Sequence, residues 1–160
     1  ELRIKEVMLS EINHRVKNNL QFISSLLSFT TKEVKDPAAA ERLDMVKARV
    51  MSLGAIHNIL YRTDATTIPS DEFVQELCRE IQSAYAMDDV DIAIDVQRVP
   101  LELDRTIPLG LLINEALLNS FKHAFAEMET PRIEVGLRRL DGGHVSLVVE
   151  DNGSGFNEPR

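Results

Sequence analysis

The stretch from Glu11 to Gln21 gathers the side-chain types that a phosphoryl acceptor needs. On a helix, the neighbours of His14 three and four positions away are all polar, so its imidazole is expected to face solvent. A neutral ring nitrogen can attack phosphorus, a carboxylate such as Glu11 can steer the other ring N–H, and the cations Arg15 and Lys17 can hold phosphate oxygens. A solvated helix face that happens to contain a histidine has the same appearance.

A second polar stripe lies in a predicted helix at 108–125. Glu115, Asn119 and Lys122 are four and three residues apart, so their side chains share one face of that helix. The carbonyl oxygen of an asparagine can coordinate a hard cation such as Mg²⁺, and a lysine can meet phosphate. His123 follows directly and, taken alone, is more often structural. A binding function and a solvated surface explain this stripe about equally well.

The third segment is Asp151-Asn-Gly153-Ser-Gly155-Phe156, directly after a predicted strand. A carboxylate at a strand end can accept a hydrogen bond from an amino group, and two glycines let the backbone approach a ligand closely. A turn that caps a strand has the same composition. The motif therefore gains its meaning from the other two segments.

Two long helices are predicted to carry the first segment. Residues 1–35 contain no Gly or Pro, and apolar residues recur there at a spacing of three and four, with Asn19 as a polar interruption. This seam consists of Leu9, Ile12, Val16, Ile23 and Leu26. Asp36 is predicted to cap a second helix that begins at Pro37 and runs to about Tyr61. Because such a hairpin alone hides little apolar surface, we expect a dimeric four-helix bundle.

After a polar linker at 63–70, the chain is predicted to alternate helices with strands. Ser70 has the position and type of a helix N-cap. Apolar and acidic residues alternate through the first strand, and Asp141-Gly142-Gly143 is typical of a β-hairpin turn. The fold class is therefore α+β, with a first domain at 1–64 and a second at 65–160. The second domain is predicted to contain a helix to about 86, a strand at 90–96, a helix at 108–125 and strands at 132–140 and 144–150.

Composition limits the classes of protein that the chain can represent. Its 160 residues suffice for one large or two small domains, and 44% hydrophobic with 28% charged residues is ordinary for a globular chain. The formal charge of −8 and the lack of a basic tract argue against nucleic-acid binding, and no apolar run approaches the ~20 residues of a membrane span. The single cysteine, Cys78, is expected to be a packing residue in a reducing cytosol, hence a cytoplasmic location. The start at Glu1 without a signal peptide predicts a fragment.

Together the three segments closely resemble the histidine-kinase core of two-component signalling systems. His14-Arg-Val-Lys-Asn-Asn-Leu-Gln is similar to the phosphoacceptor box of the subgroup in which Arg follows the histidine. This subgroup is close to the HWE kinases, although the chain has no Trp. Asn114–His123 resembles the N box, and Asp151–Phe156 resembles the G1 box. The resemblance extends over essentially the whole chain in the order of the family.

The resemblance implies a phosphoryl-transfer role for His14. This histidine would be phosphorylated on nitrogen by the γ-phosphate of ATP, and an aspartate in the receiver domain of a response regulator would then take the phosphoryl group. The family also implies a homodimer and a sensor domain upstream of Glu1. The second domain would be the gyrase-type ATPase α/β sandwich.

The resemblance also implies how the second domain would hold Mg²⁺ and ATP. Glu115 would polarise an attacking group or bind near the metal. Asn119 would bind Mg²⁺, and the basic Lys122 would lie near the phosphates. His123 matches the N-box histidine that is common in this subgroup and would belong to the cofactor-binding residues. Asp151 would hold the adenine amino group, and the glycines Gly153 and Gly155 would give the base room.

The chain departs from many histidine kinases at two places. Arg15 stands where many members place an acidic residue that acts as the base, so Glu11, one turn earlier, is our candidate for that base. The chain also ends at Arg160, before the ATP lid and the second glycine-rich box, so the ATPase domain is expected to be incomplete.

Two alternative interpretations follow from these departures. An ATP-independent histidine phosphotransfer module with a degenerate ATPase domain is favoured by the ending of the chain. It is disfavoured by the intact set of Glu115, Asn119, Lys122 and Asp151, because loss of ATP binding should have eroded those side chains first. The other alternative is a structural fragment whose hairpin only mediates assembly.

Overall fold

The computed structural model describes residues 2–60, 66–125 and 128–155, and the chain divides into two compact units at 1–64 and 65–160. The first unit is a helical hairpin, and the second combines helices with two small sheets, so the predicted α+β class is confirmed. Within the described ranges, no helix is both long and apolar enough to cross a bilayer. Some predicted positions lie outside the described backbone or side chains: Leu9, Ile12, Tyr61, residues 63–65 and Phe156.

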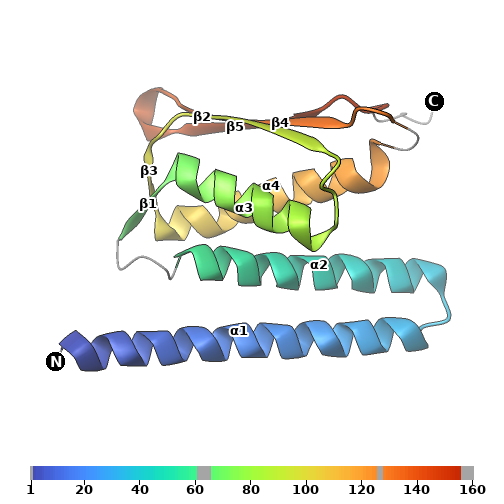
Figure 1. The fold of residues 1–160 in the computed structure, drawn as a ribbon, viewed down its shortest axis with the longest axis horizontal. Helices are drawn as coiled ribbons and strands as arrows, with labels where there is room; N and C mark the ends of the chain where they lie inside the picture. The colour runs from blue at the N-terminus through green and yellow to red at the C-terminus, as the bar shows by residue number, and fades with distance from the viewer. Residues whose placement is uncertain (1, 61–65, 126–127, 156–160) are drawn as a thin grey trace. The chain divides into compact units, whose positions relative to one another are not determined.

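The first unit consists of α1 (Leu2–Glu33) and α2 (Pro37–Leu60), which lie side by side and antiparallel (Figure 1). The amide N–H of Ala38 donates to Oδ1 of Asp36 at 3.2 Å, which confirms the predicted cap at the start of α2. Further along, a Cβ added to Gly54 of α2 would lie 3.6 Å from Cδ1 of Leu20 in α1. The two helices are therefore in van der Waals contact at this level.

The face of α1 that packs in the hairpin differs in part from the predicted seam. Val16, Leu20 and Leu27 are half-buried. Ile23 and Leu26, which the seam included, are 41% and 51% exposed. A single neighbouring helix covers a narrower face than the core of a four-helix bundle does. Ile23 and Leu26 are therefore not covered within the single chain, and their place in the seam of a four-helix bundle stays a prediction.

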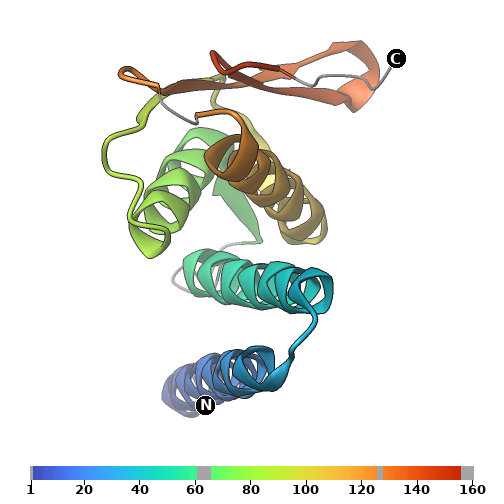
Figure 2. The ribbon, with the colours of Figure 1, turned by 90° about the vertical axis from the view of Figure 1, so that its right-hand side faces the viewer.

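In the second unit, two helices cover one face of a three-stranded sheet (Figures 1 and 2). The strand order is β2-β4-β5, with β4 parallel to β2 and antiparallel to β5. A separate two-stranded sheet pairs β1 with β3. The elements are β1 (Thr67–Pro69), α3 (Ser70–Ala84), β2 (Asp91–Val96), β3 (Pro100–Glu102), α4 (Leu103–His123), β4 (Arg132–Arg139) and β5 (Val145–Asp151).

The core of this unit lies between the sheet and the two helices. Burial alternates along the central strand β4, whose Ile133, Val135 and Leu137 are completely or almost completely buried. The helices contribute equally buried side chains, among them Phe73 and Leu77 from α3 and Ile113 and Leu117 from α4. These apolar contacts fix the face of α4 that turns towards the sheet, and they therefore fix which of its side chains remain accessible.

The predicted packing role of Cys78 is confirmed by its burial in α3. Only 2% of this residue is exposed. Burial raises the pKa of the Cys78 thiol to about 12 because the charged thiolate is disfavoured away from water. The thiol therefore stays protonated at neutral pH.

Two helix starts differ from the sequence-based prediction. Ser70 does not cap α3 but is its first residue, since its hydroxyl donates to the carbonyl oxygen of Gln97 at 2.7 Å and accepts the Val99 N–H at 2.9 Å. The helix predicted at 108–125 begins at Leu103, with Pro108 inside its N-terminal half. A proline this close to a helix start removes one backbone hydrogen bond without ending the helix. Local sequence signals therefore misplaced both starts. The Ser70 hydroxyl bonds to residues that are distant in the sequence, and Pro108 lies in a helix that has already begun.

The predicted β-hairpin between β4 and β5 is confirmed. Asp141–Gly143 form a single 3₁₀ turn, and the Leu140 N–H donates to the carbonyl oxygen of His144 at 2.9 Å. Gly142 and Gly143 have φ angles of 74° and 79°, which side chains with a Cβ rarely adopt. The glycines are therefore required by the turn.

Candidate functional site

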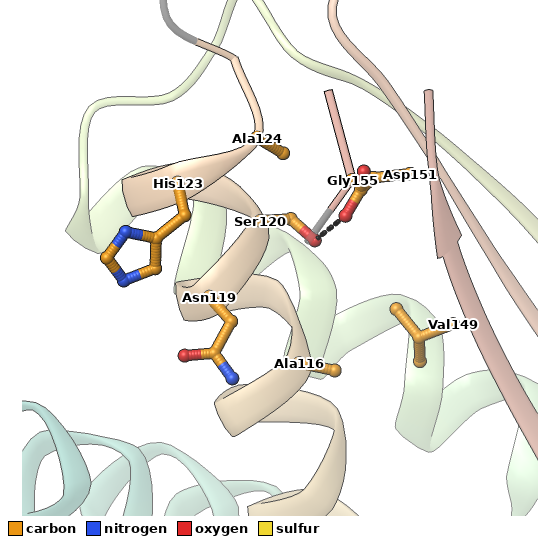
Figure 3. Close-up of a pocket in the computed structure, with 8 residues that line it drawn as sticks. All are labelled: Ala116, Asn119, Ser120, His123, Ala124, Val149, Asp151 and Gly155. Atoms are coloured by element: carbon orange, nitrogen blue, oxygen red, sulfur yellow. Dashed lines mark hydrogen bonds between the residues drawn. The ribbon is translucent and has the colours of Figure 1, made fainter. Parts of the chain in front are cut away.

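A pocket of about 230 Å³ opens where the C-terminal half of α4 faces the end of β5 (Figure 3). It brings together four of the predicted site residues, although they come from segments far apart in the sequence. The pocket is lined by Ala116, Asn119, Ser120, His123, Ala124, Val149, Asp151 and Gly155. Its wall therefore combines small apolar surfaces with one carboxylate, one amide, one hydroxyl and one imidazole.

The carboxylate of Asp151 is fixed on both oxygens. The hydroxyl of Ser120 donates to Oδ2 at 2.7 Å, which Figure 3 shows as a dashed line. The amide N–H of Gly153 donates to Oδ1 at 3.0 Å. Because one donor belongs to α4 and the other to the loop after β5, the orientation of the carboxylate depends on both elements.

The loop after β5 lies directly against the C-terminal end of α4. A Cβ added to Gly153 would lie only 2.5 Å from both the Cβ and the carbonyl oxygen of Ala124. The N–H of Ser154 also points to that carbonyl oxygen, at 3.4 Å. Gly153 is thus needed for the approach of the loop to the helix, a role that the sequence did not reveal. Gly155 lines the pocket, whereas Gly153 does not.

Asn152 links the same loop to the start of β4 and the residues just before it. Its Oδ1 accepts the backbone N–H of Arg132 at 2.8 Å, and its Nδ2 donates to the carbonyl oxygen of Thr130 at 3.0 Å. Its own backbone N–H donates to the carbonyl oxygen of Arg132 at 3.1 Å. Sequence reasoning gave Asn152 no role, although an asparagine before a glycine is a familiar turn residue.

The predicted stripe on α4 is only partly drawn into the pocket. Asn119 and Lys122 are exposed and Glu115 is half-buried, but only Asn119 lines the pocket. Glu115 lies instead near Tyr85, whose pKa is raised, first by burial and then by this carboxylate. Ser120 is buried, whereas Asn119 and His123, which also line the pocket on the C-terminal half of α4, are exposed (Figure 3). The pocket therefore has a fixed inner wall and a more accessible outer one.

Ser120 is the main functional residue that the sequence analysis missed. It is 6% exposed, and its position one residue after Asn119 turns it towards β5. The available signal was a hydroxyl among apolar packing residues on the inner face of a helix. That signal does not identify the hydrogen-bond partner of Ser120, because only the tertiary fold brings Asp151 close to it.

The acceptor segment lies in the other unit. His14 is exposed, as its polar neighbours predicted. Glu11, the candidate base, forms an ion pair with Arg15, with 2.9 Å between Oε1 and Nε, and both side chains are largely exposed. This pair joins residues four apart on one helix, a type that is worth only about 0.3–0.5 kcal/mol in water.

The described side chains fit a cation that is shared with a bound phosphate group. They contain no cluster of three or more His, Cys, Asp or Glu residues able to hold a metal ion by themselves. Asn119, exposed at the pocket, offers a hard oxygen donor. Mg²⁺ is commonly bound by only one or two protein groups together with substrate phosphates and water, so this sparse donor set suits it.

A carboxylate and an amide that line one helix–sheet pocket are features of a small-ligand site in a two-layer α/β domain. Comparison with known families shows which domains the chain is similar to. Residues 11–85 match a family described as histidine kinase, and residues 104–160 match the histidine kinase-, DNA gyrase B- and HSP90-like ATPases. The resemblance of the chain to the histidine-kinase core is therefore confirmed.

Individual relatives agree with these family matches. Sensor histidine kinase PdtaS of Mycolicibacterium smegmatis is 31% identical over 161 residues, which cover 95% of this chain and 31% of that protein. Blue-light-activated histidine kinase 2 of Erythrobacter litoralis is 24% identical over 155 residues, with 94% of this chain and 44% of that protein covered. The chain thus spans less than half the length of either relative.

Solved structures share the fold. A blue-light activated histidine kinase from Erythrobacter litoralis superposes with a TM-score of 0.63 at 23% identity, covering 94% of this chain and 48% of that one. The histidine kinase domain of a blue-light activated kinase from the same organism gives a TM-score of 0.55 at 19% identity, covering 86% of this chain and 74% of that one. At these identities the likeness concerns the fold.

The contact between Gly153 and Ala124 can be tested through stability. Gly153→Ala should lower the free energy of unfolding by about 1–3 kcal/mol, because the new methyl group overlaps backbone and Cβ atoms that are not free to move away. Gly136→Ala is the matched control, since its Cβ would lie 3.8 Å from the nearest atom, and its effect should stay within about 0.5 kcal/mol. Urea unfolding followed by circular dichroism measures both. Equal stability of the two variants would contradict the close approach.

Proposed function

We propose that this chain is the core of an ATP-dependent protein histidine kinase, with His14 as the phosphoacceptor and the α4–β5 pocket as the nucleotide site. The observation that carries the proposal is the pocket itself, which combines the fixed carboxylate of Asp151 with the exposed amide of Asn119. An acceptor-only carboxylate between small apolar walls suits the amino edge of a planar base, which favours adenine. Gly155 leaves room beside it.

The phosphoryl groups of ATP would extend from this pocket towards the outer face of α4. Asn119 would hold Mg²⁺, which neutralises charge on the phosphates when it is bound. Lys122 and His123, both exposed near the end of α4, would meet phosphate oxygens. Glu115 would act from the same face, either by polarising the attacking group or by binding near the metal.

The reaction at His14 consists of two transfers. In the first, a neutral ring nitrogen attacks the γ-phosphorus of ATP, an N–P bond forms, and the bond from phosphorus to the bridging oxygen breaks to release ADP. The proton on the other ring nitrogen passes to a base, for which Glu11 is the candidate. In the second transfer, a carboxylate oxygen of a receiver-domain aspartate attacks phosphorus, the N–P bond breaks, and a proton returns to the ring from the base or from water to restore the neutral histidine.

Glu11 could exchange Arg15 for the imidazole when it acts as that base. Its pairing with Arg15 is exposed to water on both sides, so exchange of partners costs little. Arg15 released from Glu11 is then available to a phosphate oxygen. The proposal places the chain in the cytoplasm, where ATP and a response regulator are both present, as part of a larger sensor protein.

The acceptor assignment predicts that labelling depends on one histidine. Incubation with γ-labelled ATP and Mg²⁺ should give acid-labile label on the chain, and His14→Ala should reduce that label to background while leaving the fold intact, because His14 is exposed. His144→Ala, which removes another exposed histidine, serves as the control and should label normally. Undiminished label on His14→Ala would exclude His14 as the acceptor.

Asn119→Asp separates the ATP-dependent kinase from the ATP-independent phosphotransfer module. The added negative charge should repel the triphosphate and reduce ATP-dependent labelling by about 100-fold or more. Acceptance of a phosphoryl group from a phosphorylated receiver should be unchanged, because that reaction does not use the pocket. Loss of both reactions would indicate general damage to the domain. A wild-type chain that accepts phosphate only from the receiver would favour the phosphotransfer module.

We also propose that the hairpin is the dimer interface of the kinase. Phe22 and Phe29 of α1 are 65% and 63% exposed, and their spacing of seven places them on one side of the helix. A second copy packed against this side would cover them in a four-helix bundle. The exposed large apolar residues described in this unit are Phe22, Ile23, Leu26 and Phe29 of α1 and Met45, Val46 and Met51 of α2.

The dimer interface can be tested by a double substitution. Phe22→Ser together with Phe29→Ser should weaken self-association by about 100-fold or more, since each buried phenylalanine is worth about 1.5–3 kcal/mol. Val148→Ser, which removes an exposed apolar side chain from β5, is the control and should leave the dissociation constant unchanged. Sedimentation equilibrium measures all three proteins. An unchanged dissociation constant for the double variant would place the interface elsewhere.

A further inference from the structure

We infer that Ser120 is a positioning residue that holds Asp151 for an amino group on the base of the bound nucleotide. The inference rests on the proposed function of the α4–β5 pocket and adds a determinant of base preference to it. It starts from the 2.7 Å hydrogen bond between the Ser120 hydroxyl and Oδ2 of Asp151. Both residues line the pocket, and their bond lies at its inner wall (Figure 3).

The surroundings of Ser120 hold its hydroxyl in place. The residue is 6% exposed, and its helix is anchored by the fully buried side chains of Ile113 and Leu117. Asp151 approaches from the end of β5, which pairs with Ile133 of the central strand. Neither partner can move away without disturbing the core, so the hydrogen bond joins two rigid elements.

The second donor to Asp151 does not make Ser120 redundant. The Gly153 N–H reaches Oδ1 only, from a residue two positions away on the same loop. With that bond alone, a single hydrogen bond at Oδ1 would oppose rotation of the carboxylate about the bond between Cβ and the carboxyl carbon. The hydroxyl of Ser120 fixes this rotation and sets the direction of the lone pairs that remain on both oxygens.

This arrangement presents only acceptors to a ligand. An ionised carboxylate has no proton to donate. Ser120 donates its single hydroxyl proton to Asp151, so only lone pairs remain on Oγ. A base that offers an amino group meets this edge with donors. A base that offers a carbonyl oxygen at the same position meets acceptors and leaves them unsatisfied, which costs affinity.

A purely structural role for Ser120 makes a different prediction. A buried hydroxyl that only stabilises the helix–sheet contact would, when removed, weaken every nucleotide to the same extent. A positioning role weakens only those nucleotides whose base carries the amino group. The comparison therefore needs two nucleotides that differ in this group alone.

The experiment measures dissociation constants by isothermal titration calorimetry for ATP and for purine riboside triphosphate, which lacks the 6-amino group. Ser120→Ala should weaken ATP about tenfold and change the affinity for the analogue by less than about twofold, as expected for loss of one charge-assisted hydrogen bond. Ser154→Ala removes an exposed hydroxyl from the loop after β5 and should change neither value. Ser120→Thr, which keeps the hydroxyl, should retain the wild-type preference for ATP over the analogue.

Each remaining outcome counts against the inference. If Ser120→Ala weakens the binding of both nucleotides equally, Ser120 has only a structural role. If ATP binding is unchanged, Ser120 does not contribute to the site. If Ser120→Ala does not fold, Ser120→Cys, with a similar volume and a weaker donor, should give a smaller loss of affinity that is selective for ATP. No selective loss with Ser120→Cys would overturn the inference. Failure of the wild-type chain to bind ATP would instead refute the proposed function of the pocket, and the inference with it.

Discussion

The candidate site depends on one steric constraint, the approach of the loop after β5 to the end of α4. At Gly153 there is no space for even a methyl group, because Ala124 occupies it. This approach brings Asp151 within hydrogen-bonding distance of Ser120 and closes the inner side of the pocket. A bulkier contact at this point would separate the strand from the helix and turn the pocket into open surface.

The register of the sheet determines that Asp151 faces the helix at all. Asp151 pairs with Ile133, which is fully buried beneath the helices, so both side chains lie on the inner face. A shift of one residue between β4 and β5 would turn the carboxylate to the outer face, because side chains alternate along a strand. Leu147 and Val149 of β5 resist this shift, since they share the inner face with Asp151 and would turn outward at the same time. The apolar core therefore determines where the Asp151 carboxylate lies, although Asp151 is not part of that core.

Much of the fold could be predicted from the sequence because its signals are local. The hairpin turn at Asp141–Gly143, the cap at Asp36 and the three polar motifs are each contained in a few neighbouring residues. The start of α3 could not be predicted, because the hydroxyl of Ser70 is engaged by a loop 27 to 29 residues away. The helix that covers Ile23 could not be predicted for a related reason, since an apolar spacing does not say which neighbouring helix will pack on it.

The two halves of the proposed reaction differ in how firmly their groups are held. Asp151 is fixed by two donors from separate elements, as suits a group that must recognise one ligand in one orientation. His14 is exposed on a helix surface near the water-exposed pair of Glu11 and Arg15. An acceptor that meets first a nucleotide phosphate and then a receiver aspartate must present the same nitrogen to two different partners. A buried imidazole would be reached from one direction only, so the exposed position of His14 suits the double role.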